Sequence, residues 1–141
     1  MERTYTAPLL DKLGVRPGMR VAIVGPLHDD DEADEAAEFR SGLADRTGDV
    51  TDGAPEPDTD IVFLAADSTA DLAALAAIRP RIRPNGAIWV VSRKGRAATL
   101  RDVEVMAAGR ANDLIDNKVV AFSPSRTSLR LVIPVALRPR A

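Results

Sequence analysis

Residues 15–26, Val-Arg-Pro-Gly-Met-Arg-Val-Ala-Ile-Val-Gly-Pro, decide the fold of this chain. A proline-glycine turn leads into a mainly apolar run over residues 20–24, and Gly25 stands at the carboxyl end of that run. A short apolar run of this kind is typical of a strand that is buried on both faces of a parallel sheet. Residues 60–65 and 87–92 repeat the pattern. The sequence therefore predicts an α/β protein with a mostly parallel sheet.

Helix-forming segments alternate with these runs. Apolar residues recur at helical spacing in residues 6–13, in residues 30–43, and in a segment that begins at Asp67 or Ser68. A fourth helix is predicted after Thr99, which forms a capping-box pattern with the acidic residue three positions later. Its expected apolar stripe consists of Leu100, Val103, Ala107, Ala111 and Leu114.

The remaining segments predict turns and a closing hairpin. Residues 45–57 are rich in Asp, Gly, Pro and Thr, which indicates a loop with one short edge strand near residues 49–51. Pro-Asn-Gly at residues 84–86 predicts a turn. Two strand-like segments, residues 117–122 and 129–136, are joined too tightly for a crossover, so they should pair antiparallel. We expect the first at the outer edge of the sheet and the second beside residues 87–92.

Length and composition limit the class of protein. A chain of 141 residues is expected to form one domain over residues 1–141. The absence of cysteine excludes disulfides and thiolate metal sites. No apolar run approaches the roughly 18 residues that cross a bilayer, and the first residues lack the pattern of a signal peptide. We therefore expect a cytoplasmic protein without membrane contact.

Charge is distributed unevenly along the chain. Residues 1–72 contain 17 acidic and 6 basic residues, whereas residues 73–141 contain 4 acidic and 13 basic residues. Because the net charge is −2, we expect the two halves to neutralise each other and do not expect nucleic-acid binding. The loop at residues 29–31 and the basic loop at residues 93–96 should open onto the same sheet edge. The sequence therefore predicts that arginines of the second loop reach the aspartates of the first.

Three segments carry a resemblance to a known family. Residues 13–25, 60–64 and 81–90 resemble segments of class I S-adenosylmethionine-dependent methyltransferases. They look more like a group of small uncharacterised bacterial proteins with a shortened version of that fold. The resemblance implies a small, doubly wound, three-layer Rossmann-like sheet with a C-terminal antiparallel hairpin. It also implies the strand order 2-1-4-5-7-6 in the family's terms, with the third strand deleted.

The chain departs from the family at the cofactor loop. The family has an acidic residue at the position of Ile23, and further loop glycines where this chain has Leu27 and Asp29. The resemblance maps a remaining cofactor site onto Gly25, Pro26, Asp52 and Asp67, with Asp52 or Asp49 as the acid that would hold a ribose. Asp67 and Ser68 match the family's catalytic position, but the proline and aromatic residue that should follow are absent.

These departures lead to two functional hypotheses. The first is a degenerate, non-catalytic methyltransferase-like domain that acts as a binding or interaction module, through a protein partner or self-association, with no bound cofactor. The alternative is a minimal S-adenosylmethionine-dependent methyltransferase, or another small-ligand enzyme, with a crevice rebuilt at Gly25, Asp67 and Ser92. No catalytic residue and no metal site are predicted. We expect His28 to be solvated and residues 29–31 to cap a helix rather than bind a cation.

Overall fold

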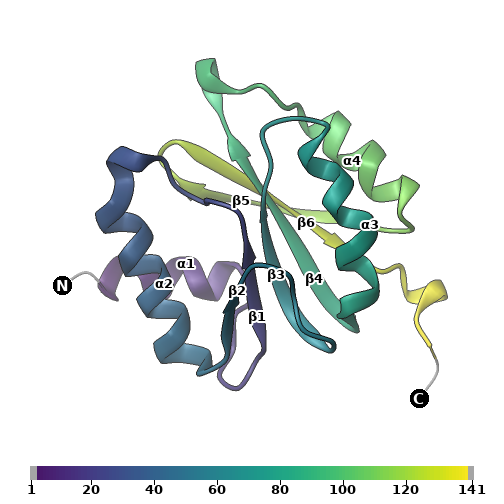
Figure 1. Cartoon of the computed structure of the whole chain (residues 1–141), viewed down its shortest axis with the longest axis horizontal. Helices are drawn as coiled ribbons and strands as arrows, with labels where there is room; N and C mark the ends of the chain where they lie inside the picture. The colour runs from purple at the N-terminus through teal and green to yellow at the C-terminus, as the bar shows by residue number, and fades with distance from the viewer. Residues whose placement is uncertain (1–2, 140–141) are drawn as a thin grey trace.

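A six-stranded sheet forms the middle layer of the structure, a computed structural model that describes residues 3–139 (Figure 1). Its strands are β1 (Val21–Val24), β2 (Val50–Asp52), β3 (Thr59–Ala65), β4 (Ile82–Arg93), β5 (Ile115–Ser123) and β6 (Arg126–Val132). They lie in the order β2-β1-β3-β4-β6-β5. The first four pair in parallel, and β6 pairs antiparallel with both β4 and β5. The predicted mixed sheet, its strand order and its terminal hairpin are therefore confirmed.

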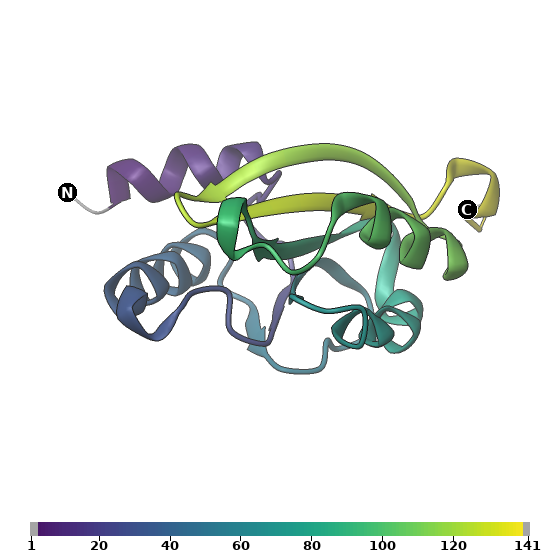
Figure 2. The same ribbon diagram turned by 90° about the horizontal axis from the view of Figure 1, so that it is seen from above.

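Helices cover both faces of the sheet. Helices α1 (Arg3–Lys12) and α2 (Ala33–Thr47) lie on one side, and α3 (Leu75–Ile78) and α4 (Asp102–Ala111) lie on the other (Figure 1). Short 3₁₀ turns complete the chain: η1 (Asp30–Glu32), η2 (Asp71–Ala74), η3 (Arg79–Arg81), η4 (Gly95–Ala97) and η5 (Val135–Leu137). Figure 2 shows the β5–β6 hairpin lying beside α1. Between residues 3 and 139, no helix has both the length and the apolar character needed to cross a membrane.

Alternate residues of β4 divide the core into two clusters. Ile88 and Val90 pack with the apolar residues of α3 and α4, whereas Trp89 and Val91 pack with those of α1 and α2. This two-sided burial is the reason the strand reads as a continuous apolar run. Trp89 is fully buried, and its indole Nε1–H donates to the carbonyl of Leu13 at 3.0 Å. The bond ties the end of α1 to the centre of the sheet.

The predicted turn at residues 84–86 is wrong. These residues are extended and belong to β4. The β3–β4 register explains the local sequence, because Thr59 pairs with Ile82 but Ile61 pairs with Ala87. The intervening residues form an irregular stretch opposite Asp60, where proline does not have to donate a ladder hydrogen bond.

The boundaries of two C-terminal elements also differ from expectation. Helix α4 begins at Asp102, and the capping contact joins the Arg101 amide to Glu104 at 3.0 Å, so the predicted Thr99 cap is wrong. Val103, placed in the predicted apolar stripe, is 59% exposed. Strand β6 ends at Val132, before Pro134, which lacks the amide that a strand needs for pairing.

The indole bond of Trp89 gives a test of the core. Replacing Trp89 with Phe removes the donor to the Leu13 carbonyl and leaves a small void, so we expect a loss of about 1–3 kcal/mol in the free energy of unfolding. Val103→Ala, at an exposed position, should change it by less than about 0.5 kcal/mol. Urea denaturation monitored by circular dichroism measures both. Equal stability of the two variants would contradict the anchoring role.

Candidate functional site

A crevice of about 700 Å³ lies at the carboxyl ends of β1, β3 and β4. This edge is where ligands bind in open α/β sheets. The loop after β1 contributes Gly25, Pro26 and Asp29, and the loop after β3 contributes Asp67. Arg93 from the end of β4 and the first residue of β6 complete its charged wall. The structure therefore brings together three of the four predicted cofactor-site residues.

Two arginines and two aspartates form an ion-pair network in this crevice. Asp29 Oδ1 accepts from a terminal nitrogen of Arg93 at 2.7 Å and from one of Arg126 at 2.7 Å. The other terminal nitrogens of Arg93 and Arg126 lie 3.5 and 3.4 Å from Asp67 Oδ2. Each guanidinium thus bridges the same two carboxylates. The predicted contact between the basic loop and the acidic loop is confirmed for Arg93.

Asp67 also joins two loops through backbone contacts. Its Oδ1 accepts the amide N–H of Arg93 at 2.9 Å, and its own carbonyl accepts the Thr99 hydroxyl. Its amide donates to the carboxylate of Asp71 at 2.9 Å. The carboxylate is therefore oriented by the main chain as well as by the arginines.

Arg126 is the buried member of the network. Its side chain is 2% exposed, whereas that of Arg93 is 39% exposed. The two residues pair directly in the β4–β6 ladder, so their like charges require counterions nearby. Arg126 Nε is the one buried side-chain nitrogen or oxygen without a hydrogen-bond partner in the described part of the chain. The carboxylates of Asp29 and Asp67 compensate the buried positive charge of Arg126.

The network changes the ionisation of its exposed members. The hydrogen bond from Arg93 is the main cause that lowers the pKa of Asp29, and the nearby Arg126 charge adds to it against partial desolvation. The reciprocal bond to Asp29 raises the pKa of Arg93. Both groups are therefore held in their charged forms.

Gly25 lets the loop after β1 approach β3 closely. Its φ of +83° lies in the left-handed region, and a Cβ at this position would stand 3.2 Å from the Cβ of Ala65. The crevice begins directly beyond this contact. The positive φ and the tight contact with Ala65 thus both favour glycine at the end of β1.

Asp52, the fourth predicted cofactor residue, lies outside the crevice lining. It is the last residue of β2 and receives a two-pronged contact from Arg40 of α2, the shorter N–O distance being 2.9 Å. This bond is the main cause that lowers the pKa of Asp52. The other acid considered for a ribose, Asp49, pairs with Arg20 at 3.1 Å. Both candidates already have cationic partners.

The expectation that the single histidine is solvated is wrong. His28 is half-buried, and its ring centroid lies 6.0 Å from that of Phe39 and 5.5 Å from that of Phe122. Burial is the main cause that lowers the pKa of His28. The acidic surroundings in sequence concealed these aromatic neighbours, which come from α2 and β5.

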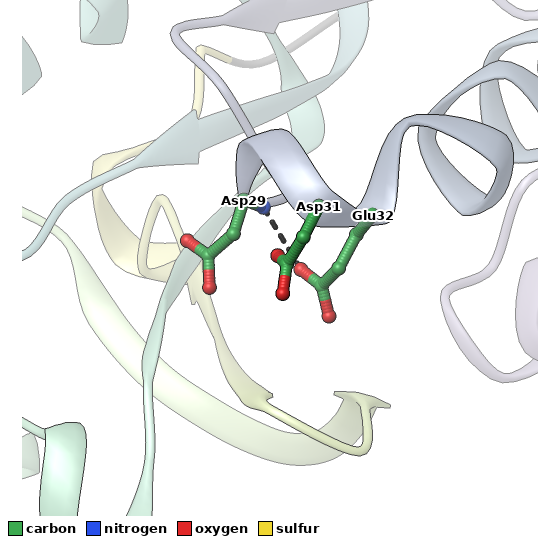
Figure 3. Close-up of side chains that lie close together, drawn as sticks. All are labelled: Asp29, Asp31 and Glu32. Atoms are coloured by element: carbon green, nitrogen blue, oxygen red, sulfur yellow. Dashed lines mark hydrogen bonds between the residues drawn. The ribbon is translucent and has the colours of Figure 1, made fainter.

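Asp29, Asp31 and Glu32 lie close together at the start of η1 (Figure 3). One carboxylate oxygen from each residue lies within 4.8 Å of those from the other two. Glu32 accepts the amide of Asp29 at 2.8 Å and the hydroxyl of Ser125 at 2.9 Å, while Asp29 is paired with arginines. Residues 29–31 thus lie at the start of a helical turn, as predicted, but the carboxylate that caps it belongs to Glu32.

The other predicted residues do not join the site. Ser92 is buried and is not among the lining residues, although the small-ligand alternative placed it there. Lys94 and Arg96 follow Arg93 but neither forms part of the ion-pair network. Arg126 was missed, because its place opposite Arg93 depends on the register of the antiparallel hairpin.

Similarity to known proteins is restricted to the fold. The chain matches no protein-family model and no curated protein sequence. It matches the precorrin-6y C5,15-methyltransferase from Geobacter metallireducens with 10% identity and a TM-score of 0.57, covering 91% of this chain and 86% of that one. It matches magnesium protoporphyrin IX methyltransferase from Synechocystis, solved with bound SAM, with 12% identity and a TM-score of 0.56, covering 94% and 77%.

The coverage of longer structures is smaller. The chain spans 61% of an O-methyltransferase family 2 protein from Planctomyces limnophilus, with 12% identity and a TM-score of 0.54 over 93% of its own length. It spans about half, 54% and 49%, of two further matched chains. The shared feature is the Rossmann-like fold of class I S-adenosylmethionine-dependent methyltransferases.

The ionisation of Asp29 predicts sensitivity to acid. Because its folded-state pKa is lowered, its contribution to stability is fully present above its unfolded-state pKa of about 3.9. That contribution is lost as the pH falls through the folded-state pKa. We therefore expect Asp29→Asn to lower stability at pH 6 and to flatten its decline below pH 4. Chemical denaturation across this pH range provides the measurement.

Asp30→Asn is the matched control, because Asp30 lines the same crevice and has no ion pair among the described residues. Its pH profile should follow that of the unsubstituted chain. A profile of Asp29→Asn that coincides with that of Asp30→Asn would show that the network does not stabilise the fold.

Proposed function

We propose that this chain is a degenerate, non-catalytic methyltransferase-like domain that acts as a binding or interaction module. The observation that supports it most is the pairing of Arg93 and Arg126 with Asp29 and Asp67 across the crevice. Such a network stabilises the walls of the crevice and occupies the polar groups that a cofactor would use.

The loop after β1 argues against retained cofactor binding. S-adenosylmethionine carries a carboxylate at its methionyl end, and this loop presents Asp29 and Asp30 to the crevice. Like charges at close range would oppose contact between that carboxylate and this loop, although the ammonium and sulfonium of the same ligand would not be repelled. Leu27 is 5% exposed and packs in the core, so the loop has no bare backbone at that position. Asp52 is held by Arg40 instead of being turned to the crevice.

The second candidate is a minimal S-adenosylmethionine-dependent methyltransferase. Two observations favour it: the fold shared with solved methyltransferases, and a crevice of about 700 Å³, which is large enough for a ligand of that size. Gly25 at the end of β1 and Asp67 at the end of β3 would then bind the cofactor.

The crevice charge also bears on the kind of partner. Four aspartates and two arginines line it, which disfavours a nucleic-acid backbone and favours a cationic group. We propose a protein partner, a second copy of the chain, or a small molecule that carries positive charge on the contacting group.

Titration calorimetry with S-adenosylmethionine and S-adenosylhomocysteine separates the two candidates. The non-catalytic proposal predicts a dissociation constant weaker than about 100 µM for both compounds, which corresponds to about 5.5 kcal/mol of binding free energy. A tighter constant that is lost in Asp67→Asn would overturn it in favour of the methyltransferase. Asp34→Asn, at an exposed position outside the crevice lining, serves as the matched charge control.

A further inference from the structure

We infer that the crevice is a guanidinium-binding site and that the Arg93 side chain is its internal, displaceable occupant. The inference rests on the proposed function in one respect, namely that a cofactor does not fill the crevice. It specifies the chemical class of the group that the site accepts. The Arg93 side chain then inhibits binding of that group by occupying the site itself.

The contacts of Arg93 define the preferred chemistry. One terminal nitrogen lies 2.7 Å from Asp29 Oδ1 and the other lies 3.5 Å from Asp67 Oδ2. The two carboxylates come from different loops, after β1 and after β3. A planar guanidinium presents two nitrogens at a fixed spacing and can bridge them, whereas an ammonium is a single point of charge. The site is therefore shaped for a guanidinium group.

The site does not need the Arg93 side chain to keep its form. Asp67 Oδ1 is held by the Arg93 backbone amide at 2.9 Å, a bond that remains after truncation of the side chain. The Asp29 amide is bound by Glu32 at 2.8 Å, which fixes the loop that carries the second carboxylate. Removal of the side chain should therefore vacate a preformed site.

The exposed fraction of the side chain distinguishes Arg93, the displaceable occupant, from Arg126. Arg126 makes the same two carboxylate contacts but is 2% exposed, so it cannot leave without opening the hairpin. Arg93 is 39% exposed, and the side chains of Asp29 and Asp67 are 32% and 25% exposed. An external guanidinium can thus replace that of Arg93 without burying an additional charge.

The surrounding charge favours a cation after Arg93 has moved. Asp30 and Asp71 also line the crevice, and His28, with its lowered pKa, adds no positive charge at neutral pH. With the Arg93 side chain displaced, Arg126 is the remaining cation that faces four aspartates in the lining. The vacated position is therefore strongly acidic.

The test uses agmatine, a small guanidine, at constant ionic strength. Arg93→Ala should bind agmatine at least about tenfold more tightly than the unsubstituted chain, because the internal occupant no longer competes at high effective concentration. Arg96→Ala is the matched control, since it removes the same charge from the same loop outside the network. Its affinity should equal that of the unsubstituted chain. Equal affinity of Arg93→Ala and Arg96→Ala would overturn the inference.

Further arms test the chemistry and the source of the group. Putrescine, which has an ammonium in place of the guanidinium of agmatine at the same total charge, should bind Arg93→Ala at least about tenfold more weakly than agmatine. Asp29→Asn combined with Arg93→Ala should abolish the gain. A short peptide with one central arginine distinguishes a protein side chain from a free small molecule. If Arg93→Ala is poorly folded, Arg93→Gln retains chain length and supports the same comparison.

Failure of this inference is distinguishable from failure of the proposed function. Tight S-adenosylmethionine binding by the unsubstituted chain would overturn the non-catalytic proposal whatever the agmatine result. Absence of agmatine binding by a folded Arg93→Ala variant would overturn the guanidinium site and leave the non-catalytic proposal standing.

Discussion

The buried guanidinium of Arg126 is the constraint on which the carboxyl edge of this structure depends. A charged group with 2% exposure needs counterions, and its ladder partner Arg93 carries the same charge. Asp29 and Asp67 meet this need from two loops that are distant in sequence. Four segments, after β1, after β3, at the end of β4 and at the start of β6, are thereby held together.

The sheet sets the position of the crevice, and this requirement for counterions sets its charged wall. The sheet keeps the strand order and the terminal hairpin of the methyltransferase fold. Its β2–β3 connection is short, covering residues 53–58, and β2 has three residues. Gly53 returns the chain by donating its amide to the Ile23 carbonyl at 2.7 Å. Neither β2 nor the 53–58 connection contributes a lining residue to the crevice, whereas the arginine–aspartate network forms its charged wall.

The two candidate functions differ in how the same groups are used. If the crevice is a cofactor site, Asp67 and Gly25 would contact the cofactor. The side chains of Arg93 and Arg126 would then have to leave space for it. As an interaction site, Asp29 and Asp67 form a carboxylate pair whose outer guanidinium can be exchanged. The second use requires no rearrangement of Arg126, the group that is most costly to move.

The sequence by itself determined the order of strands and helices, because apolar runs, turn residues and helical spacing are local properties. It also placed the acidic loop after β1 and the basic loop after β4 at one edge, since parallel strands end together. It misplaced the residues at 84–86 and the start of α4, where register and loop contacts override local preference. Only the tertiary structure brought Arg126 beside Arg93 and His28 against Phe39. Those neighbours depend on hairpin register and on packing between elements far apart in the chain, which no local pattern encodes.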